Sequence, residues 1–95
     1  SNIRIGVAYL AILREKYRNL SPYFMVAAYN MGPGAVNQIQ KRIKAQGKDP
    51  NQWVNLYDYL QRNQARNGRY KQAVQYVTRI RTYLEHLKTS NRIDV

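Results

Sequence analysis

The sequence has no cysteine and is poor in glycine, proline and acidic residues. Its 95 residues include five glycines, three prolines and five acidic residues. Without cysteine the chain can form neither a disulfide bond nor a thiolate metal site. No apolar run approaches the roughly 20 residues of a membrane span. The first residues, Ser1 to Arg4, lack the apolar core of a signal peptide, so any export signal was removed or was never part of this chain.

The scarcity of acids leaves a large positive charge. Sixteen Lys and Arg residues give a formal net charge of +11, with +6 over residues 1–47 and +5 over residues 48–95. This even spread favours a polyanionic partner such as nucleic acid, an anionic membrane or an acidic cell-wall polymer. Charge alone does not choose among these classes.

The apolar residues recur at helical spacing, and no strand pattern, repeat or low-complexity tract competes with them. We therefore expect one all-α domain over residues 1–95, with about five helices. The expected spans are residues 3–18, 22–30, 35–46, 50–61 and 69–88, with fraying from residue 89.

Caps and apolar stripes support these spans. We expect Ser21 and Asp49 to be N-caps, each followed by proline, and Gly47 to end the third helix. The end of the first helix, residues 14–18, is expected to be solvated. The predicted packing residues, in helix order, are Ile5, Tyr9, Ile12 and Leu13, then Phe24, Met25, Ala27 and Ala28, then Val36, Ile39 and Ile43, then Trp53, Val54, Tyr57 and Leu60, and finally Ala73, Val77, Ile80, Leu84 and Leu87.

Residues 27–34, Ala-Ala-Tyr-Asn-Met-Gly-Pro-Gly, combine a compact helix end with a polar pair and a tight turn. Gly32 is expected to take a left-handed backbone that ends the helix, and Pro33 to prevent its continuation. Gly34 should leave the turn bare, so that a ligand can approach Tyr29 and Asn30. Alone, the octet also fits an ordinary helix end.

This octet resembles the signature of the lytic transglycosylases, bacterial enzymes of lysozyme-like fold that cleave peptidoglycan. Residues 2–13 also resemble the family's helix that immediately precedes the motif. A third stretch, residues 72–80, resembles the family's Glu-Thr-Arg-x-Tyr-Val segment: Tyr76, Val77 and Ile80 match, whereas residues 72–74 are Gln, Ala and Val. The resemblance implies that the chain corresponds to the C-terminal lobe of the catalytic domain and lacks the family's N-terminal helices.

The resemblance also implies the site residues. Tyr29 and Tyr76 would face the catalytic acid and the sugar at the cleavage point, Asn30 would hold substrate or backbone, and Gly32 would shape the turn. The alternative for Tyr76 is core packing with a satisfied hydroxyl. Gln72 stands where the family has glutamate, so the resemblance does not imply that residue 72 contacts the ligand. The family needs no cofactor.

The family's catalytic glutamate, in a Glu-Ser pair, does not occur in these residues, so no catalytic residue is expected in this chain. Each carboxylate has an ordinary alternative duty. Glu15 and Glu85 have basic neighbours on their own helices, Asp49 is an expected cap, and Asp94 is in the tail. Asp58, between two tyrosines, is the least implausible substitute, but Arg62 follows one turn later.

Other candidate sites are weaker. His86 is the only histidine, which makes a metal site implausible. Trp53 is expected in the core, with a sugar-stacking platform as the alternative. The basic stretches 41–48 and 62–71 are expected to be solvated faces, with polyanion contact as the alternative.

We therefore expect part of a periplasmic or cell-wall lytic transglycosylase whose partner is a peptidoglycan strand and which is inactive alone. A non-catalytic peptidoglycan-binding or scaffold module is the first alternative. A basic nucleic-acid-binding domain is the second, although no base-reading motif is evident. Without the family's first helices, the face of Ile5, Tyr9 and Ile12 would be exposed. Such an apolar face would promote self-association or binding of a missing N-terminal segment.

Overall fold

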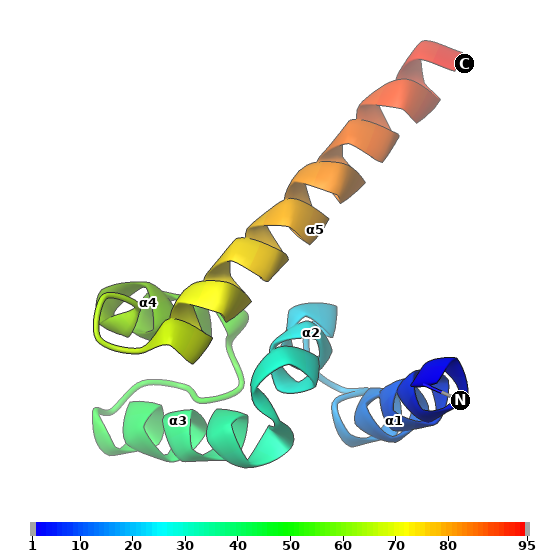
Figure 1. Cartoon of the computed structure of the whole chain (residues 1–95). Coiled ribbons are helices and arrows are strands. Elements are labelled where there is room, and N and C mark those ends of the chain that lie inside the picture. Colours follow the sequence, from blue (N-terminus) through cyan, green and yellow to red (C-terminus); the bar gives the residue numbers. More distant parts are fainter. Residues whose placement is uncertain (1, 95) are drawn as a thin grey trace.

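The structure is a computed structural model that describes the backbone of residues 2–94 and the side chains of residues 8–88. Within these residues it contains five helices and no strand, which confirms the all-α prediction (Figure 1). The helices are α1 (Asn2–Lys16), α2 (Pro22–Met31), α3 (Pro33–Ala45), α4 (Trp53–Asn63) and α5 (Gly68–Asp94).

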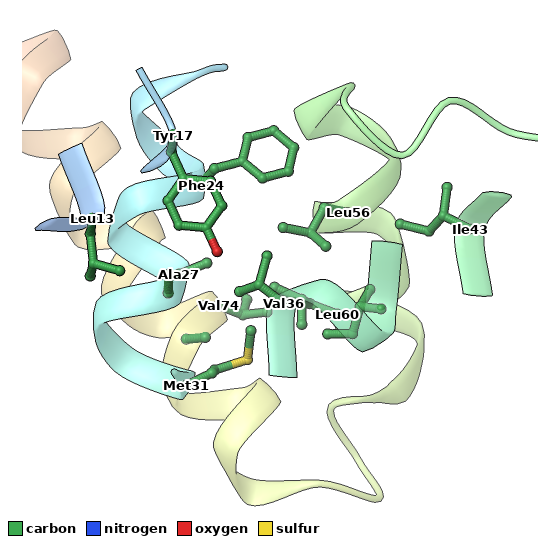
Figure 2. Close-up of a cluster of buried hydrophobic side chains, with 13 residues drawn as sticks. Leu13, Tyr17, Phe24, Ala27, Met31, Val36, Ile43, Leu56, Leu60 and Val74 are labelled. Carbon is green, nitrogen blue, oxygen red and sulfur yellow. The ribbon is translucent and has the colours of Figure 1, made fainter. Parts of the chain in front are cut away.

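Helix α2 occupies the centre of the fold and packs against α1, α3 and α5, while α4 packs against α3 and α5. Its small residues Ala27 and Ala28 are fully buried, which lets the neighbouring helices approach closely. Figure 2 shows the apolar cluster that these helices enclose. The cluster contains Leu13, Tyr17, Phe24, Ala27, Ala28, Met31, Val36, Ile39, Ile43, Leu56, Leu60, Ala73 and Val74.

The predicted N-cap of α2 and the predicted glycine at the end of α3 are both confirmed. The Ser21 side chain accepts a hydrogen bond from the backbone N–H of Tyr23, and Pro22 is the first helical residue. Gly47 has a positive φ of 82°. The N–H of Lys48 donates to the carbonyl of Ile43 across that turn, 3.1 Å away, so Gly47 ends α3 as predicted.

The predicted start of the fourth helix is wrong. Asp49 caps a turn instead, because its Oδ1 accepts a hydrogen bond from the backbone N–H of Asn51. Helix α4 begins only at Trp53, with Gln52 as an N-cap that makes no side-chain bond. Along α4, Leu56 and Leu60 are buried, whereas the predicted packing residue Val54 is 67% exposed.

Helix α5 is longer than predicted and only its first half is packed. It continues to Asp94 because no glycine or proline interrupts it after Gly68, so the expected fraying from residue 89 is wrong. Figure 1 shows its C-terminal half extending away from the other helices. Ala73 and Val77 are buried as predicted, but Leu84 and Leu87, which the same stripe placed in the core, are 43% and 40% exposed.

Helix α1 presents a different face from the predicted one. Leu13 is buried, but Ile12 is 64% exposed, and the side chain of Ile5 lies outside the described residues. Tyr17, predicted in a solvated helix end, is buried against Phe24 with their ring centroids 6.4 Å apart. The chain turns toward α2 directly after Lys16, and this turn carries the Tyr17 ring into the core.

Candidate functional site

Tyr29 and Asn30 lie in the last turn of α2, on its exposed side. The Nδ2 of Asn30 donates a hydrogen bond to the carbonyl of Val26, 3.0 Å away. This bond fixes the amide along the helix surface and leaves its oxygen, Oδ1, directed away from that carbonyl. Tyr29 is 42% exposed, and its ring lies against Tyr9 of α1 with centroids 6.1 Å apart.

The Gly-Pro-Gly turn after α2 is tighter than the sequence suggests. Gly32 has φ 90° and ψ 147°, a positive-φ conformation that is nearly exclusive to glycine but is not the predicted left-handed helical one. Its N–H donates to the carbonyl of Ala28, 2.7 Å away, and it is also the N-cap of α3. Pro33 and Gly34 are therefore already helical, so Gly34 is part of α3 rather than a bare turn residue.

A hollow of about 220 Å³ lies between the end of α2 and the middle of α5. It is lined by Asn30, Gln72, Gln75, Tyr76 and Arg79. The four α5 residues are spaced three, four and seven apart, which places them on one helical face. Asn30 and Tyr76, which come from two separate motif stretches, thus line one hollow.

The sequence anticipated only part of this lining. Gln72, where ligand contacts were in doubt, does line the hollow, and Gln75 and Arg79 were missed. Their helical register with Tyr76 is the signal that could have found them. Tyr29 is not among the lining residues; its ring faces Tyr9 instead. The structure therefore brings Asn30 and Tyr76 together and sets Tyr29 beside them on the α1 side.

None of the described carboxylates lines this hollow. Glu15 pairs with Arg18, Asp58 with Arg62 at 3.0 Å, and Glu85 with Lys88 at 3.9 Å. Asp49 caps its own turn, and the side chain of Asp94 lies outside the described residues. Asp58 lines a different hollow with Tyr59, Arg62 and Asn63. The ion pairs of Glu15, Asp58 and Glu85 agree with the surface roles expected from the sequence.

Trp53 belongs to an aromatic cluster at the edge of the core, as expected. Its ring lies 5.5 Å from those of Tyr23 and Phe24 and 5.7 Å from that of Tyr57. His86 is exposed on the outer half of α5, and the described side chains include no group of His, Asp or Glu that could hold a metal ion. The part of the chain described by the structure contains no helix able to cross a membrane.

Two tyrosine hydroxyls differ in their environments. Arg42, in the basic stretch 41–48, donates from Nη1 to the hydroxyl of Tyr59, 2.8 Å away, which raises the pKa of Arg42. The buried hydroxyl of Tyr17 has no hydrogen-bond partner within the described residues. Burial raises the pKa of Tyr17 above the ordinary 10.0, and the neighbouring Tyr9 adds to the shift.

Comparison with known sequences decides the family. The profile of the family described as "Transglycosylase SLT domain" matches residues 1–52, more than half of the chain. This chain is a member of the transglycosylase SLT domain family. The matched segment contains α1, α2 and the Ala-Tyr-Asn motif, so the resemblance noted from the sequence is confirmed.

Relatives of this transglycosylase-family chain extend the match into α5. A protein from Desulfosudis oleivorans, named membrane-bound lytic murein transglycosylase F, is 35% identical over 106 residues, covering 97% of this chain and 23% of that protein. A protein of the same name from Vibrio cholerae is 31% identical over 100 residues, covering 90% of this chain and 19% of that protein. The chain thus spans about a quarter or less of these curated relatives. No solved structure gives a significant match.

Proposed function

We propose that this chain forms one wall of the glycan cleft of a lytic transglycosylase, as a single domain over residues 1–95 corresponding to the C-terminal lobe of the catalytic domain. Its substrate would be a peptidoglycan strand, and the protein would work in the periplasm or at the cell wall. Family membership and the names of the relatives support this proposal. In it, Asn30 and Tyr76 contact the sugar, Tyr29 faces the reacting bond, and Gly32 holds the turn between them.

The observation that carries the proposal is the shared hollow of Asn30 and Tyr76. The two residues lie on α2 and α5, which pack against each other. Ala27 and Ala28 of α2 and Ala73 of α5 are buried in the same apolar cluster. Tyr76 is 42% exposed, so it is not a core tyrosine. A half-exposed phenol beside amide side chains provides both an apolar ring and hydrogen-bonding groups, which is what a sugar ring requires.

The proposed reaction needs one protonated carboxyl group. That acid would protonate the oxygen between N-acetylmuramic acid and N-acetylglucosamine, and the carboxylate would then accept the proton of the sugar's 6-hydroxyl as this oxygen closes a 1,6-anhydro ring. The described carboxylates are held in ion pairs or a turn away from the hollow. We therefore propose that the acid comes from residues outside these 95.

The first test is product release. Purified peptidoglycan incubated with this chain should yield no 1,6-anhydromuropeptides above a no-protein control, as measured by mass spectrometry, whereas the longer natural protein should release them. Release by this chain alone would show that an acid within it suffices. If the longer protein binds peptidoglycan but also releases no 1,6-anhydromuropeptides, a non-catalytic peptidoglycan-binding module is favoured instead.

The second test is retention on peptidoglycan sacculi. Tyr76→Ala and Asn30→Ala should each weaken binding about tenfold, because each removes a contact from the hollow. Tyr83→Ala is the matched control, since Tyr83 lies two turns further along α5 and is 62% exposed. Equal losses for Tyr76→Ala and Tyr83→Ala would contradict the proposed cleft. All three are changes of exposed residues, and circular dichroism would verify that each variant is folded.

The exposed apolar side chains of α1 support a second proposal, that of self-association. Ile12 is 64% exposed and Leu10 is 37% exposed on the same helix, and Tyr9 is only partly buried. Tyr9 and Ile12 are three residues apart and so share one face of α1, and exposed apolar surface of this kind promotes association. We propose that two copies of this chain associate through α1 when no other segment covers it.

A further inference from the structure

Core packing does not require the particular polar side chains on the face of α5 that lines the hollow. Ala73, Val74 and Val77 are buried, whereas Gln72, Gln75, Tyr76 and Arg79, between and beside them on the helix, are exposed. The core would accept almost any polar residue at these exposed positions. Two glutamines and one arginine therefore give the hollow a chemical character that folding does not require.

Arg79 gives the hollow a positive charge with no compensating acid among the described residues. The Glu and Asp side chains in the described range make their ion pairs or caps elsewhere, with Arg18, Arg62, Lys88 and the Asn51 backbone as partners. Gln72 occupies the position where the resembling family has glutamate, so the amide there adds no negative charge. An anionic ligand in this hollow would meet the positive charge of Arg79 and none of the described carboxylates.

The donors around the hollow fit a carboxylate next to amides. A guanidinium offers two parallel N–H groups that match the two oxygens of a carboxylate. The side-chain amides of Gln72 and Gln75 supply further donors and acceptors on the same face, and Oδ1 of Asn30 supplies an acceptor from α2. Together these groups suit an acylated amino sugar that also carries a carboxylate.

We propose that Arg79, assisted by Gln75, forms a carboxylate subsite that selects muramic-acid-containing glycan over neutral N-acetylglucosamine glycan. This inference rests on the proposed function and adds to it the determinant of specificity. The carboxylate is either that of the lactyl group on the sugar or one in the attached peptide, since both present the same chemistry to the guanidinium. Tyr76 contacts the ring in either case, and Arg79 adds the preference for charge.

The test measures binding of the whole 95-residue chain to three probes by isothermal titration calorimetry. The probes are neutral chitotetraose, an alternating N-acetylglucosamine–N-acetylmuramic acid tetrasaccharide without peptide, and the same tetrasaccharide with its stem peptides. We expect the chain to bind at least one carboxylate-bearing probe about tenfold more tightly than chitotetraose. A preference already present without peptide assigns the lactyl carboxylate, and one that appears only with peptide assigns the peptide carboxylate.

Two variants separate this subsite from the general positive charge. Arg79→Gln removes the guanidinium, and Gln75→Glu places a carboxylate one turn before Arg79, where it forms an ion pair with it. For both variants the preference, measured as the ratio of the variant's own affinities for the carboxylate-bearing probe and for chitotetraose, should fall to about one. Arg81→Gln is the matched control, because Arg81 carries the same charge on the opposite face of α5 and is exposed; it should keep the preference.

The outcomes distinguish the two proposals. Equal binding of all three probes, or a preference that survives Arg79→Gln, overturns the carboxylate subsite and leaves the glycan cleft intact. An equal loss with Arg81→Gln also overturns it, because the effect would then be one of net charge. Binding of none of the three probes contradicts the glycan cleft itself and the subsite with it.

Discussion

At the scale of single residues, the exposure of each tyrosine separates the one buried in the core from those proposed to contact the glycan. Tyr17 is 5% exposed and packs on Phe24, whereas Tyr76 and Tyr29 are each 42% exposed at the end of α2 or beside it. Figure 2 shows the Tyr17 hydroxyl directed into the apolar cluster, where it meets no hydrogen-bond partner within the described residues. This hydroxyl therefore costs stability, since it loses its water without a replacement.

Replacing Tyr17 with phenylalanine should stabilise the chain. Without the buried hydroxyl, the free energy of unfolding should rise by about 1 kcal/mol at neutral pH, as measured by urea denaturation. An alkaline effect follows from the raised pKa of Tyr17. Above pH 10 the unfolded chain loses this proton while the folded chain keeps it, so the unfolded state binds fewer protons and stability falls as pH rises.

Tyr17→Phe should accordingly lose less stability than the unmodified chain between pH 8 and pH 11. Tyr23→Phe is a suitable control, because Tyr23 is only partly buried and stacks on Trp53. A loss of stability in Tyr17→Phe, with an unchanged alkaline slope, would show that the Tyr17 hydroxyl has a favourable partner.

At the scale of elements, the Gly-Pro-Gly junction fixes how α2 meets α3 and thereby where Asn30 sits. Gly32 both ends α2 and caps α3, so its positive φ determines the angle between the two helices. A Cβ at Gly32 or at Gly34 would meet no atom within 4 Å. The requirement for glycine is thus conformational at Gly32, and no neighbouring atom of the chain imposes it at Gly34.

Alanine at these two glycines should have opposite effects. Gly32→Ala should lower the free energy of unfolding by about 1–3 kcal/mol, because a side chain is strained at φ 90°. Gly34→Ala should raise it by about 0.5 kcal/mol, because alanine restricts the unfolded chain and fits a helical position with open space around it. Thermal and urea unfolding of both variants measure this difference. Equal stabilities would contradict the backbone assignment of the junction.

How much the sequence predicts also differs between elements. In α3, Val36, Ile39 and Ile43 follow the helical period without interruption, and all three are buried. At Asp49 the same residue types that begin a helix also begin a turn, and hydrogen bonding to Asn51 selects the turn. In α5 the apolar period continues past the point where other helices can cover it, so Leu84 and Leu87 fit the pattern and are nevertheless exposed.

The candidate site was predictable only where a motif marked it. Asn30 and Tyr76 stand in motif stretches, whereas Gln75 and Arg79 are polar residues on an exposed helix face and resemble any solvated position. Only the packing of α2 against α5 shows that they share a hollow with Asn30. Periodicity identifies the face of a helix, and tertiary packing decides what lies opposite that face.

At the scale of the whole molecule, the chain combines a well-packed centre with two exposed apolar surfaces. The centre is built around α2. The exposed apolar side chains are Leu10 and Ile12 on α1 and Tyr83, Leu84 and Leu87 on α5. The positive charge is spread over both halves of the sequence and opposes association of copies. Salt should therefore strengthen any association driven by the apolar surfaces.

The proposed self-association should depend on Ile12. Sedimentation velocity of the unmodified chain at about 100 µM should reveal a dimer whose fraction increases with salt, and Ile12→Lys should shift it to monomer. Because Ile12 is 64% exposed, this change should alter the free energy of unfolding by less than about 0.5 kcal/mol. Val54→Lys is the control, since Val54 is 67% exposed on α4. A chain that remains monomeric at every salt concentration would contradict the proposal.

The central claim is that a peptidoglycan strand binds where the end of α2 meets the middle of α5. A nitrogen–proton correlation spectrum of the labelled chain, titrated with a peptidoglycan tetrasaccharide, tests this most directly. The account predicts that the largest shift changes fall on the residues lining that hollow, Asn30, Gln72, Gln75, Tyr76 and Arg79. Changes centred instead on the hollow around Asp58 and Arg62, or spread evenly over the basic surface, would contradict it.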